Sequence, residues 1–308
     1  MRRTILLLGL LTNLLVAHAG DRISFEVKIN EVSLKYNIAS FSAMPGDTLQ
    51  IIFSGNTTDQ FVGKYNTGQL IEDSRLNWRY ILPEKSGHYE LIILHNNPPE
   101  KIILNLFVLT PASQQKGDYL NGYRIGNYPE KLFRNNPKYK PPTGFIEVTE
   151  ANKNVQVSPH FQLKQFLCKQ QPNHWPKYLL LDPRLLTKLE MVIERLERKG
   201  NKAGDMFIMS GYRTPYYNAA IHNGKYSRHI YGDAADVYID ENHDAVIDDL
   251  NKDGRASMAD AEVIYQVVEA IEREPGNKYL IGGMGKYNKT ASHTWDVHID
   301  TRGYRARW

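Results

Sequence analysis

Cysteine is almost absent from this sequence. The 308 residues include a single cysteine, Cys168, so no disulfide can form within the chain. In the run F-L-C-K this thiol is expected to be a small buried apolar side chain rather than a ligand. The fold must therefore be stabilised without covalent cross-links.

A large charge of either sign is also missing. The chain has 38 Lys and Arg against 34 Asp and Glu, a formal net charge of +4. Without Arg2 and Arg3 the charge falls to +2. Such a small excess does not predict nucleic-acid binding. It is compatible with an anionic cell-wall polymer as partner.

Long hydrophobic runs are absent beyond the N-terminus. Residues 1–19 have the parts of a secretory signal peptide: basic Arg2 and Arg3, the apolar run Ile5–Val16, and the cleavage motif Ala17-His18-Ala19. The apolar run is too short to span a bilayer. The residue directly after the cleavage motif is Gly20 rather than a cysteine, so no lipoprotein anchor is expected. The sequence predicts an exported protein, periplasmic or extracellular, with no membrane span.

Residues 20–110 are predicted to form an all-β domain. Short runs rich in Val, Ile, Leu, Phe and Tyr alternate with turn signals such as Pro45-Gly46-Asp47. The expected strands are Ile23–Ile29, Ser33–Ile38, Thr48–Phe53, His88–Leu94 and Lys101–Leu109. Their spacing favours a small β-sandwich of immunoglobulin-like architecture. No chemistry is visible in it, so we expect a binding or positioning domain.

Residues 111–144 are predicted to be a connector. The segment is rich in proline and tyrosine, which is typical of a semi-rigid linker that packs on a domain surface. Beyond it, Asp182-Pro183 and Gly200 delimit one amphipathic helix, and residues 261–274 form a second. The run Met206–Met209 reads as a buried strand that leads into S-G-Y-R.

Two separated motifs carry the ligand types of a metal site. S-R-H-I-Y-G-D-A-A-D contains His229 and Asp236, and V-H-I-D near the C-terminus contains His298. Two imidazoles and one carboxylate are a common ligand set for a catalytic zinc ion, which keeps its fourth position open for water. These three residues are therefore the predicted zinc ligands.

Each motif continues as an alternating run typical of a strand. In D-V-Y-I-D, Asp236 and Asp240 share one face, and in W-D-V-H-I-D the residues Asp296, His298 and Asp300 share one face. His298 thus has a carboxylate two residues away on each side. One of them would act as general base and the other would orient an imidazole.

The motif order S-G-Y-R-T-P-x-Y-N, then S-R-H-x-x-G-D-A-x-D, then V-H-I-D-T-R-G resembles the zinc D-alanyl-D-alanine peptidases of the Hedgehog/DD-peptidase fold, and within them the murein endopeptidase branch. The resemblance covers Val157–Trp308. It implies an α+β fold, with an antiparallel sheet and flanking helices in residues 145–308, following the β-sandwich.

The resemblance also implies roles for individual residues. His229, Asp236 and His298 would bind zinc. Arg213, the arginine of S-G-Y-R, would face the substrate and stabilise an oxyanion or hold a peptide carboxylate. Ser227 would offer its hydroxyl to the substrate.

The identity of the catalytic base stays open at this point. Several relatives place it three residues before the last histidine, where this chain has Trp295, and others place it two residues before, where it has Asp296. The strand-face argument favours Asp296, with Asp300 as the alternative.

A second candidate metal site lies between the zinc motifs. Residues 249–260 follow the pattern of an EF-hand calcium loop, with glycine at the sixth position. The predicted ligands are Asp249, Asn251, Asp253, the backbone carbonyl of Arg255, Ser257 and Asp260. Asp at the twelfth position, and Ala256 at the eighth, depart from the usual pattern. A calcium ion here would be structural, and the alternative is a solvated acidic turn.

Taken together, the sequence predicts an exported zinc metallopeptidase acting on peptidoglycan peptides, as a D,D- or L,D-carboxypeptidase or endopeptidase. The alternative is a metal-containing module that binds the cell wall or signals without hydrolysing anything. The presence of Arg213 and a base beside the ligands favours the enzyme.

Overall fold

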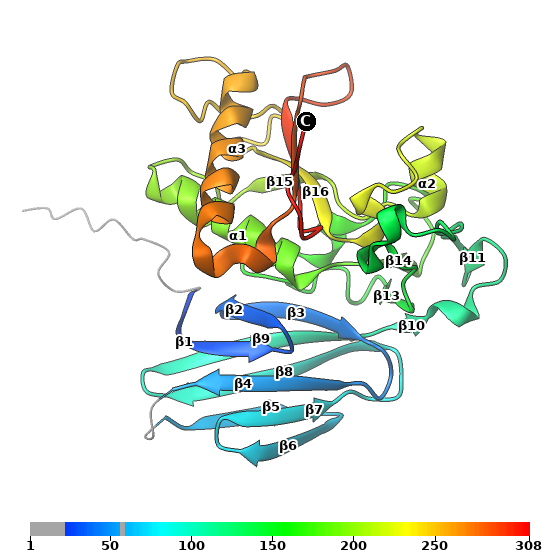
Figure 1. Cartoon of the computed structure of the whole chain (residues 1–308), viewed down its shortest axis with the longest axis vertical. Coiled ribbons are helices and arrows are strands. Elements are labelled where there is room, and N and C mark those ends of the chain that lie inside the picture. Colours follow the sequence, from blue (N-terminus) through cyan, green and yellow to red (C-terminus); the bar gives the residue numbers. More distant parts are fainter. Residues whose placement is uncertain (1–21, 56–58) are drawn as a thin grey trace, which may run out of the picture.

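The computed structural model describes residues 22–55 and 59–308. The predicted signal peptide, residues 1–19, lies outside them. The described chain contains many strands and few helices, which confirms the α+β class. Figure 1 shows the early strands gathered at one end of the molecule and the helices α1, α2 and α3 at the other.

Residues 22–108 form two β-sheets. The first has the strand order β2-β1-β4-β7-β6, and the second has the order β3-β9-β8-β5. The strands are β1 (Arg22–Ile29), β2 (Val32–Tyr36), β3 (Ile38–Ala43), β4 (Thr48–Ser54), β5 (Phe61–Tyr65), β6 (Gln69–Ser74), β7 (Asn77–Ile81), β8 (Gly87–Asn96) and β9 (Pro99–Val108). Only the pairing of β3 with β9 is parallel within these two sheets.

The two sheets share one apolar core. Along β4, Leu49, Ile51 and Phe53 are buried while the residues between them are exposed, as the two-residue period of a strand requires. Phe53 packs edge-on against Trp78, with ring centroids 4.8 Å apart. Leu91 of the other sheet belongs to the same cluster. Burial of these side chains therefore joins the sheets face to face.

The five strands expected in this region are confirmed as β1, β2, β4, β8 and β9, with small shifts at their ends. The sequence does not predict β3, β5, β6 and β7. In β6, Glu72, Asp73 and Ser74 are exposed, and β5 contains Gly63 and Lys64, so neither shows a clear apolar alternation. Pairing with longer neighbours, rather than local pattern, makes these segments strands.

Residues 110–179 contain short elements and pack on the C-terminal part. They are β10 (Thr110–Pro111), η1 (Ala112–Gln114), β11 (Tyr119–Leu120), β12 (Tyr123–Arg124), η2 (Phe133–Asn135), η3 (Pro137–Tyr139), β13 (Gly144–Val148), η4 (Leu163–Phe166) and β14 (Lys177–Leu179). Leu120, Tyr123 and Ile125 are fully buried in the large C-terminal core. The proline-rich segment therefore lies against the rest of the protein, as its tyrosines predict.

A five-stranded sheet lies at the centre of the C-terminal part. Its strand order is β15-β16-β18-β17-β19, and all pairs except β17 with β19 are antiparallel. The elements are α1 (Pro183–Arg198), β15 (Met206–Ser210), α2 (Pro215–Ala220), η5 (Arg228–Tyr231), β16 (Ala234–Ile239), α3 (Met258–Arg273), η6 (Pro275–Leu280), β17 (Gly283–Tyr287), β18 (Asp296–Asp300) and β19 (Ala306–Arg307).

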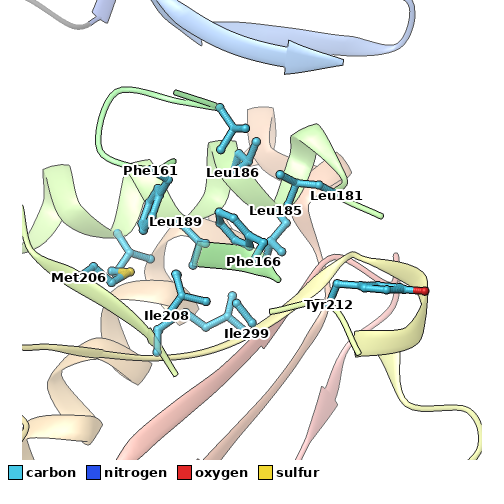
Figure 2. Packing of buried hydrophobic residues seen from close by; sticks show 14 of the residues in the cluster. Phe161, Phe166, Leu181, Leu185, Leu186, Leu189, Met206, Ile208, Tyr212 and Ile299 are labelled. Carbon is cyan, nitrogen blue, oxygen red and sulfur yellow. The ribbon is translucent and has the colours of Figure 1, made fainter. Parts of the chain in front are cut away.

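The predicted helix after Asp182 is confirmed as α1. The Asp182 carboxylate accepts a hydrogen bond from the Arg184 backbone N–H at 2.8 Å, and Pro183 occupies the first helical position. Figure 2 shows Leu185 and Leu189 of α1 packed with Ile208 of β15 and Ile299 of β18. One face of the sheet is thereby covered by α1, which leaves the alternate side chains of β18 on the opposite face.

Contacts fix the N-terminal sheets against the C-terminal part. The Tyr36 hydroxyl donates to a carboxylate oxygen of Glu194 at 2.9 Å, and Arg22 donates to the other oxygen at 2.7 Å. The Asn105 amide donates to the carbonyl of Gln156 at 2.8 Å. None of the helices within residues 22–55 and 59–308 combines the length and apolarity needed to cross a bilayer.

Candidate metal centre

The backbone brings the three predicted zinc ligands together from three elements. Asp236 of β16 and His298 of β18 are direct partners in the antiparallel ladder, so their side chains leave the sheet side by side. His229 lies on η5, whose last turn ends at Gly232 with φ of 72°. A Cβ atom at position 232 would lie 2.4 Å from the Leu180 backbone, so this turn requires glycine.

The three ligand atoms lie close to one another. His298 Nδ1 is 2.8 Å from Asp236 Oδ1, His229 Nε2 is 3.2 Å from the same oxygen, and His229 Nε2 is 3.2 Å from His298 Nδ1. All three residues are buried. They are the only group of three or more metal-ligating side chains found together in the part of the chain that the structure describes.

Hydrogen bonds behind the imidazoles set which nitrogen faces the cluster. His229 Nδ1 is 2.7 Å from the Gly211 carbonyl oxygen, to which it donates, so its Nε2 faces Asp236. His298 Nε2 is 3.1 Å from Asp300 Oδ2, so its Nδ1 faces Asp236. Each ring is thus held by a partner behind it, as is usual for metal-binding histidines.

This arrangement fits a zinc ion. Metal–ligand bonds of about 2.0–2.1 Å in a tetrahedral site place neighbouring ligand atoms about 3.3 Å apart, and the separations between these atoms are 2.8–3.2 Å. Two imidazole nitrogens and a carboxylate oxygen turned toward one point are the donor set that zinc prefers. The donor chemistry and the spacing therefore agree with the predicted metal.

The ligands also influence one another's pKa values. Burial lowers the pKa of His229. Burial opposes protonation of His298 as well, but its hydrogen bonds to Asp236 and Asp300 outweigh burial and raise its pKa to about 9. Burial acts to raise the pKa of Asp236, yet the two histidines hold it well below its usual value. The carboxylate of Asp236 is therefore ionised and ready to bind a cation.

The two carboxylates that flank His298 are placed differently. Asp300 accepts hydrogen bonds from His298, from the Gly283 backbone N–H at 2.7 Å, and from Arg302 through both its backbone and its guanidinium. Neither oxygen of Asp296 makes a hydrogen bond, although both are buried. Burial and the charge of Asp236 raise the pKa of Asp296 to about 7. Asp300 orients His298, whereas the Asp296 carboxylate makes no hydrogen bond and its Oδ2 lies 3.1 Å from His293 Nδ1.

Arg213 lies at the site, where its guanidinium contacts Asp236, one of the predicted zinc ligands. Its Nη2 donates to Asp236 Oδ2 at 2.5 Å, and its Nε donates to Ser210 Oγ at 2.7 Å. Its guanidinium thus binds the carboxylate oxygen of Asp236 that faces away from the histidines. Ser227 is half-buried at the start of η5, and its hydroxyl does not cap that turn.

Side chains of β17 and the C-terminal segment border the site, and the sequence analysis does not identify them. Gly285 pairs with His298 and Tyr287 pairs with Asp296 in the ladder. The Trp308 ring lies 5.1 Å from the His298 ring, centroid to centroid. Residues 283–287 form β17. The alternation of Gly283, Gly285 and Tyr287 was the signal for a strand.

The sequence patterns do not identify His293, another residue near Asp296. His293 Nδ1 donates to the Thr294 carbonyl at 2.7 Å and lies 3.1 Å from Asp296 Oδ2. His293 belongs to the connection between β17 and β18, where no periodicity predicts its direction.

The predicted calcium loop has another arrangement. Asp249, Asn251 and Asp253 accept hydrogen bonds from backbone N–H groups of the loop itself. Asp260 is fully buried and accepts from the backbone of Leu250 at 2.8 Å and Ser257 at 2.7 Å, where it completes the capping box of α3. Both oxygens of the Asp260 carboxylate therefore already accept hydrogen bonds from backbone N–H groups. Calcium binding at this loop stays a prediction that the structure does not support.

Comparison with known proteins gives one family match. The model of the Peptidase M15 family matches residues 159–266, a stretch that contains His229 and Asp236 and ends before His298. This match supports the M15 zinc peptidase superfamily, whose members are zinc-dependent hydrolases. No curated protein matches the chain.

Two solved structures show partial similarity. One is a nucleoside hydrolase-related hypothetical protein from Saccharophagus degradans, with 11% identity over 28% of this chain and a TM-score of 0.21. The other is a DUF4784 family protein from Bacteroides caccae, with 14% identity over 32% of this chain and a TM-score of 0.17. The matches span 25% and 26% of those chains. Similarity of this extent supports no conclusion about the fold or function of this chain.

Proposed function

We propose that the protein is an exported zinc metallopeptidase that hydrolyses peptide bonds of peptidoglycan, as a D,D- or L,D-carboxypeptidase or endopeptidase. The observation that carries this proposal is the convergence of His229 Nε2, Asp236 Oδ1 and His298 Nδ1 within 3.2 Å of one another. The peptidoglycan substrate, the export and the D-alanyl-D-alanine subtype rest on the motif resemblance and the predicted signal peptide.

When bound, zinc supplies Lewis-acid activation of water and of the scissile carbonyl. The residues around it would perform the remaining chemistry. Asp296, whose oxygens make no hydrogen bond, takes a proton from the attacking water as the water oxygen bonds to the carbonyl carbon. Asp296 then returns the proton to the leaving nitrogen as the C–N bond breaks, which yields a carboxylate and an amine.

The other polar groups hold this geometry. Arg213 fixes the outer oxygen of Asp236, and its positive charge lies beside the carbonyl that becomes negative in the transition state. Asp300 keeps the His298 ring in place. The hydroxyl of Ser227, next to η5, would form a hydrogen bond with a polar group or the backbone of the substrate peptide.

The test is digestion of defined muropeptides by the purified mature protein, followed by mass spectrometry. We expect cleavage of a stem or cross-link peptide bond that stops on chelation and returns with zinc. The mass of the products distinguishes D,D from L,D cleavage and end-trimming from cross-link cutting. A zinc-loaded protein that releases no product from any stem or cross-linked peptide would contradict the proposal and favour a non-catalytic wall-binding module.

A further inference from the structure

On the side of β17 that faces the site, the strand has no side chain until its last residue, Tyr287. Gly283, Gly285 and Tyr287 alternate on the face that carries Asp300, His298 and Asp296. A Cβ atom at position 283 would lie 2.5 Å from Asp300 Oδ2, and one at position 285 would lie 2.2 Å from Trp308 Nε1. The two glycines make room for the carboxylate and the indole. Tyr287 is therefore the first side chain of β17 on this face.

Tyr287 and Trp308 are bonded to each other beside the buried ligands. The indole Nε1–H donates to the Tyr287 hydroxyl oxygen at 2.8 Å. Tyr287 is 40% exposed and Trp308 is 49% exposed, whereas His229, Asp236 and His298 are buried. These two aromatic side chains thus offer accessible surface next to the metal centre.

The hydrogen bond decides what the Tyr287 hydroxyl can still do. An indole N–H only donates, so the phenol oxygen is the acceptor in this pair and the phenol proton stays available to another group. The hydroxyl lies within electrostatic range of Asp236 and Asp296, and burial together with these charges raises the pKa of Tyr287. The phenol therefore keeps its proton at neutral pH.

Among the described residues, Arg213 and Ser227 are the other hydrogen-bond donors assigned to the substrate. Arg213 already uses Nε and Nη2 on Ser210 and Asp236, and the surrounding carboxylates of Asp236, Asp296 and Asp300 only accept. A substrate carbonyl that gains negative charge is stabilised further by each additional donor aimed at its oxygen.

We propose that the Tyr287 hydroxyl donates a hydrogen bond to the oxygen of the scissile carbonyl, and that Trp308 holds the phenol in that orientation. Tyr287 is then a catalytic residue and Trp308 a positioning residue. This inference rests on the proposed peptidase function, since it names a further group, beside Arg213, that stabilises the oxyanion of that reaction.

The first experiment is Tyr287→Phe assayed on the muropeptide that the wild type cleaves. Removal of one oxyanion donor lowers kcat by about 100-fold, while KM and the zinc content of the purified protein stay close to wild type. Tyr65→Phe is the matched control, because Tyr65 is similarly exposed, at 41%, on the N-terminal sheets. It should leave kcat unchanged.

The second experiment measures binding rather than turnover. A phosphinate analogue of the cleaved dipeptide carries its negative oxygens where the oxyanion forms. Tyr287→Phe should weaken binding of this analogue by about 100-fold in calorimetric titration. Binding of a peptide of the same sequence that is not cleaved, because the configuration of its residues at the scissile bond is inverted, should change little. Trp308→Phe, which keeps a ring but removes the N–H, should weaken binding of the phosphinate analogue by about 5-fold, the equivalent of one neutral hydrogen bond.

The outcomes separate the two proposals. An active wild type with an equally active Tyr287→Phe, or with unchanged phosphinate affinity, overturns the role of Tyr287 and leaves the peptidase standing. A wild type that cleaves no muropeptide overturns the peptidase, and the role of Tyr287 falls with it. A kcat loss accompanied by loss of zinc would assign Tyr287 to the metal site instead and also overturn the inference.

Discussion

Asp296 and Asp300 have the same side chain and lie on the same face of β18, yet their surroundings differ. The oxygens of Asp300 are taken up by His298, Gly283 and Arg302. Those of Asp296 make no hydrogen bond. A general base needs a free lone pair within reach of water, and a positioning carboxylate needs a fixed partner. This difference supports our proposal that Asp296, rather than Asp300, is the base.

Asp296→Asn should lower kcat by about 1,000-fold without loss of zinc, because the amide cannot take a proton from water. The measurement is muropeptide turnover together with metal analysis of the purified variant. Asp205→Asn serves as control, since Asp205 is an exposed carboxylate away from the ligands. Wild-type turnover in Asp296→Asn would rule out this residue as the base.

Asp300→Asn should instead weaken zinc binding, by about 10- to 100-fold, because His298 loses the carboxylate that holds its ring. Competition with a chromophoric chelator measures the zinc affinity directly. Asp296→Asn is the comparison in the same assay and should bind zinc as the wild type does. Equal affinities of all three proteins would show that Asp300 does not orient His298.

Between elements, a charged network joins α3 to the last strand. Glu269 of α3 accepts hydrogen bonds from Arg305 and Arg307 at 2.5 Å each, and Glu272 binds Lys188 of α1 at 2.6 Å. Lys188 is completely buried and also donates to the Asp300 carbonyl at 2.8 Å. These pairs tie both helices to the segment that carries Asp300 and Trp308.

Glu269→Gln should lower the free energy of unfolding by about 1–2 kcal/mol at pH 7. Burial acts to raise the pKa of Glu269, but Arg307 and Arg305 outweigh it and hold the pKa below its usual value. A lowered carboxylate pKa stabilises the folded state above the unfolded value and loses that effect as the pH falls through the folded value. Urea unfolding at pH 7 and pH 3 should therefore show a difference between wild type and variant that shrinks in acid. A difference in unfolding free energy that is the same at both pH values would contradict this role of the Glu269 carboxylate.

In the whole molecule, the metal centre links segments that are far apart in the sequence. His229, Asp236 and His298 come from η5, β16 and β18, and an unfolded chain does not hold them together. A ligand that binds only the folded state stabilises it by about 2.7 kcal/mol at a concentration 100 times its Kd.

Zinc added to the chelator-treated protein should therefore raise the Tm by about 5 °C, since about 1 kcal/mol shifts a protein of this size by roughly 2 °C. Differential scanning fluorimetry measures the shift. His229→Ala should show no shift with zinc. A rise of the same size in His229→Ala would place the stabilising zinc elsewhere.

The α+β class was implied by the motif resemblance, whereas local patterns were enough to predict the helix that begins after Asp182 and the strands that carry Asp236 and His298. Each depends on neighbours in the sequence: a capping carboxylate followed by proline, or a two-residue apolar alternation. The strands β5 and β6 were not predictable in this way, because their apolar residues are few and their pairing partners decide their conformation. The calcium loop shows the reverse case, where the sequence follows most of the EF-hand pattern but the Asp260 carboxylate accepts hydrogen bonds from the backbone.

The choice of ligand types, two imidazoles and a carboxylate, follows from the sequence alone, because the chemistry of a side chain does not depend on the fold. Which carboxylate is free, which group Arg213 binds, and that Tyr287 and Trp308 stand beside the ligands were decided only in three dimensions. Those facts depend on the register between β16, β18 and β17, and on the space left by Gly283 and Gly285. Register is a property of paired strands, and no single strand contains it.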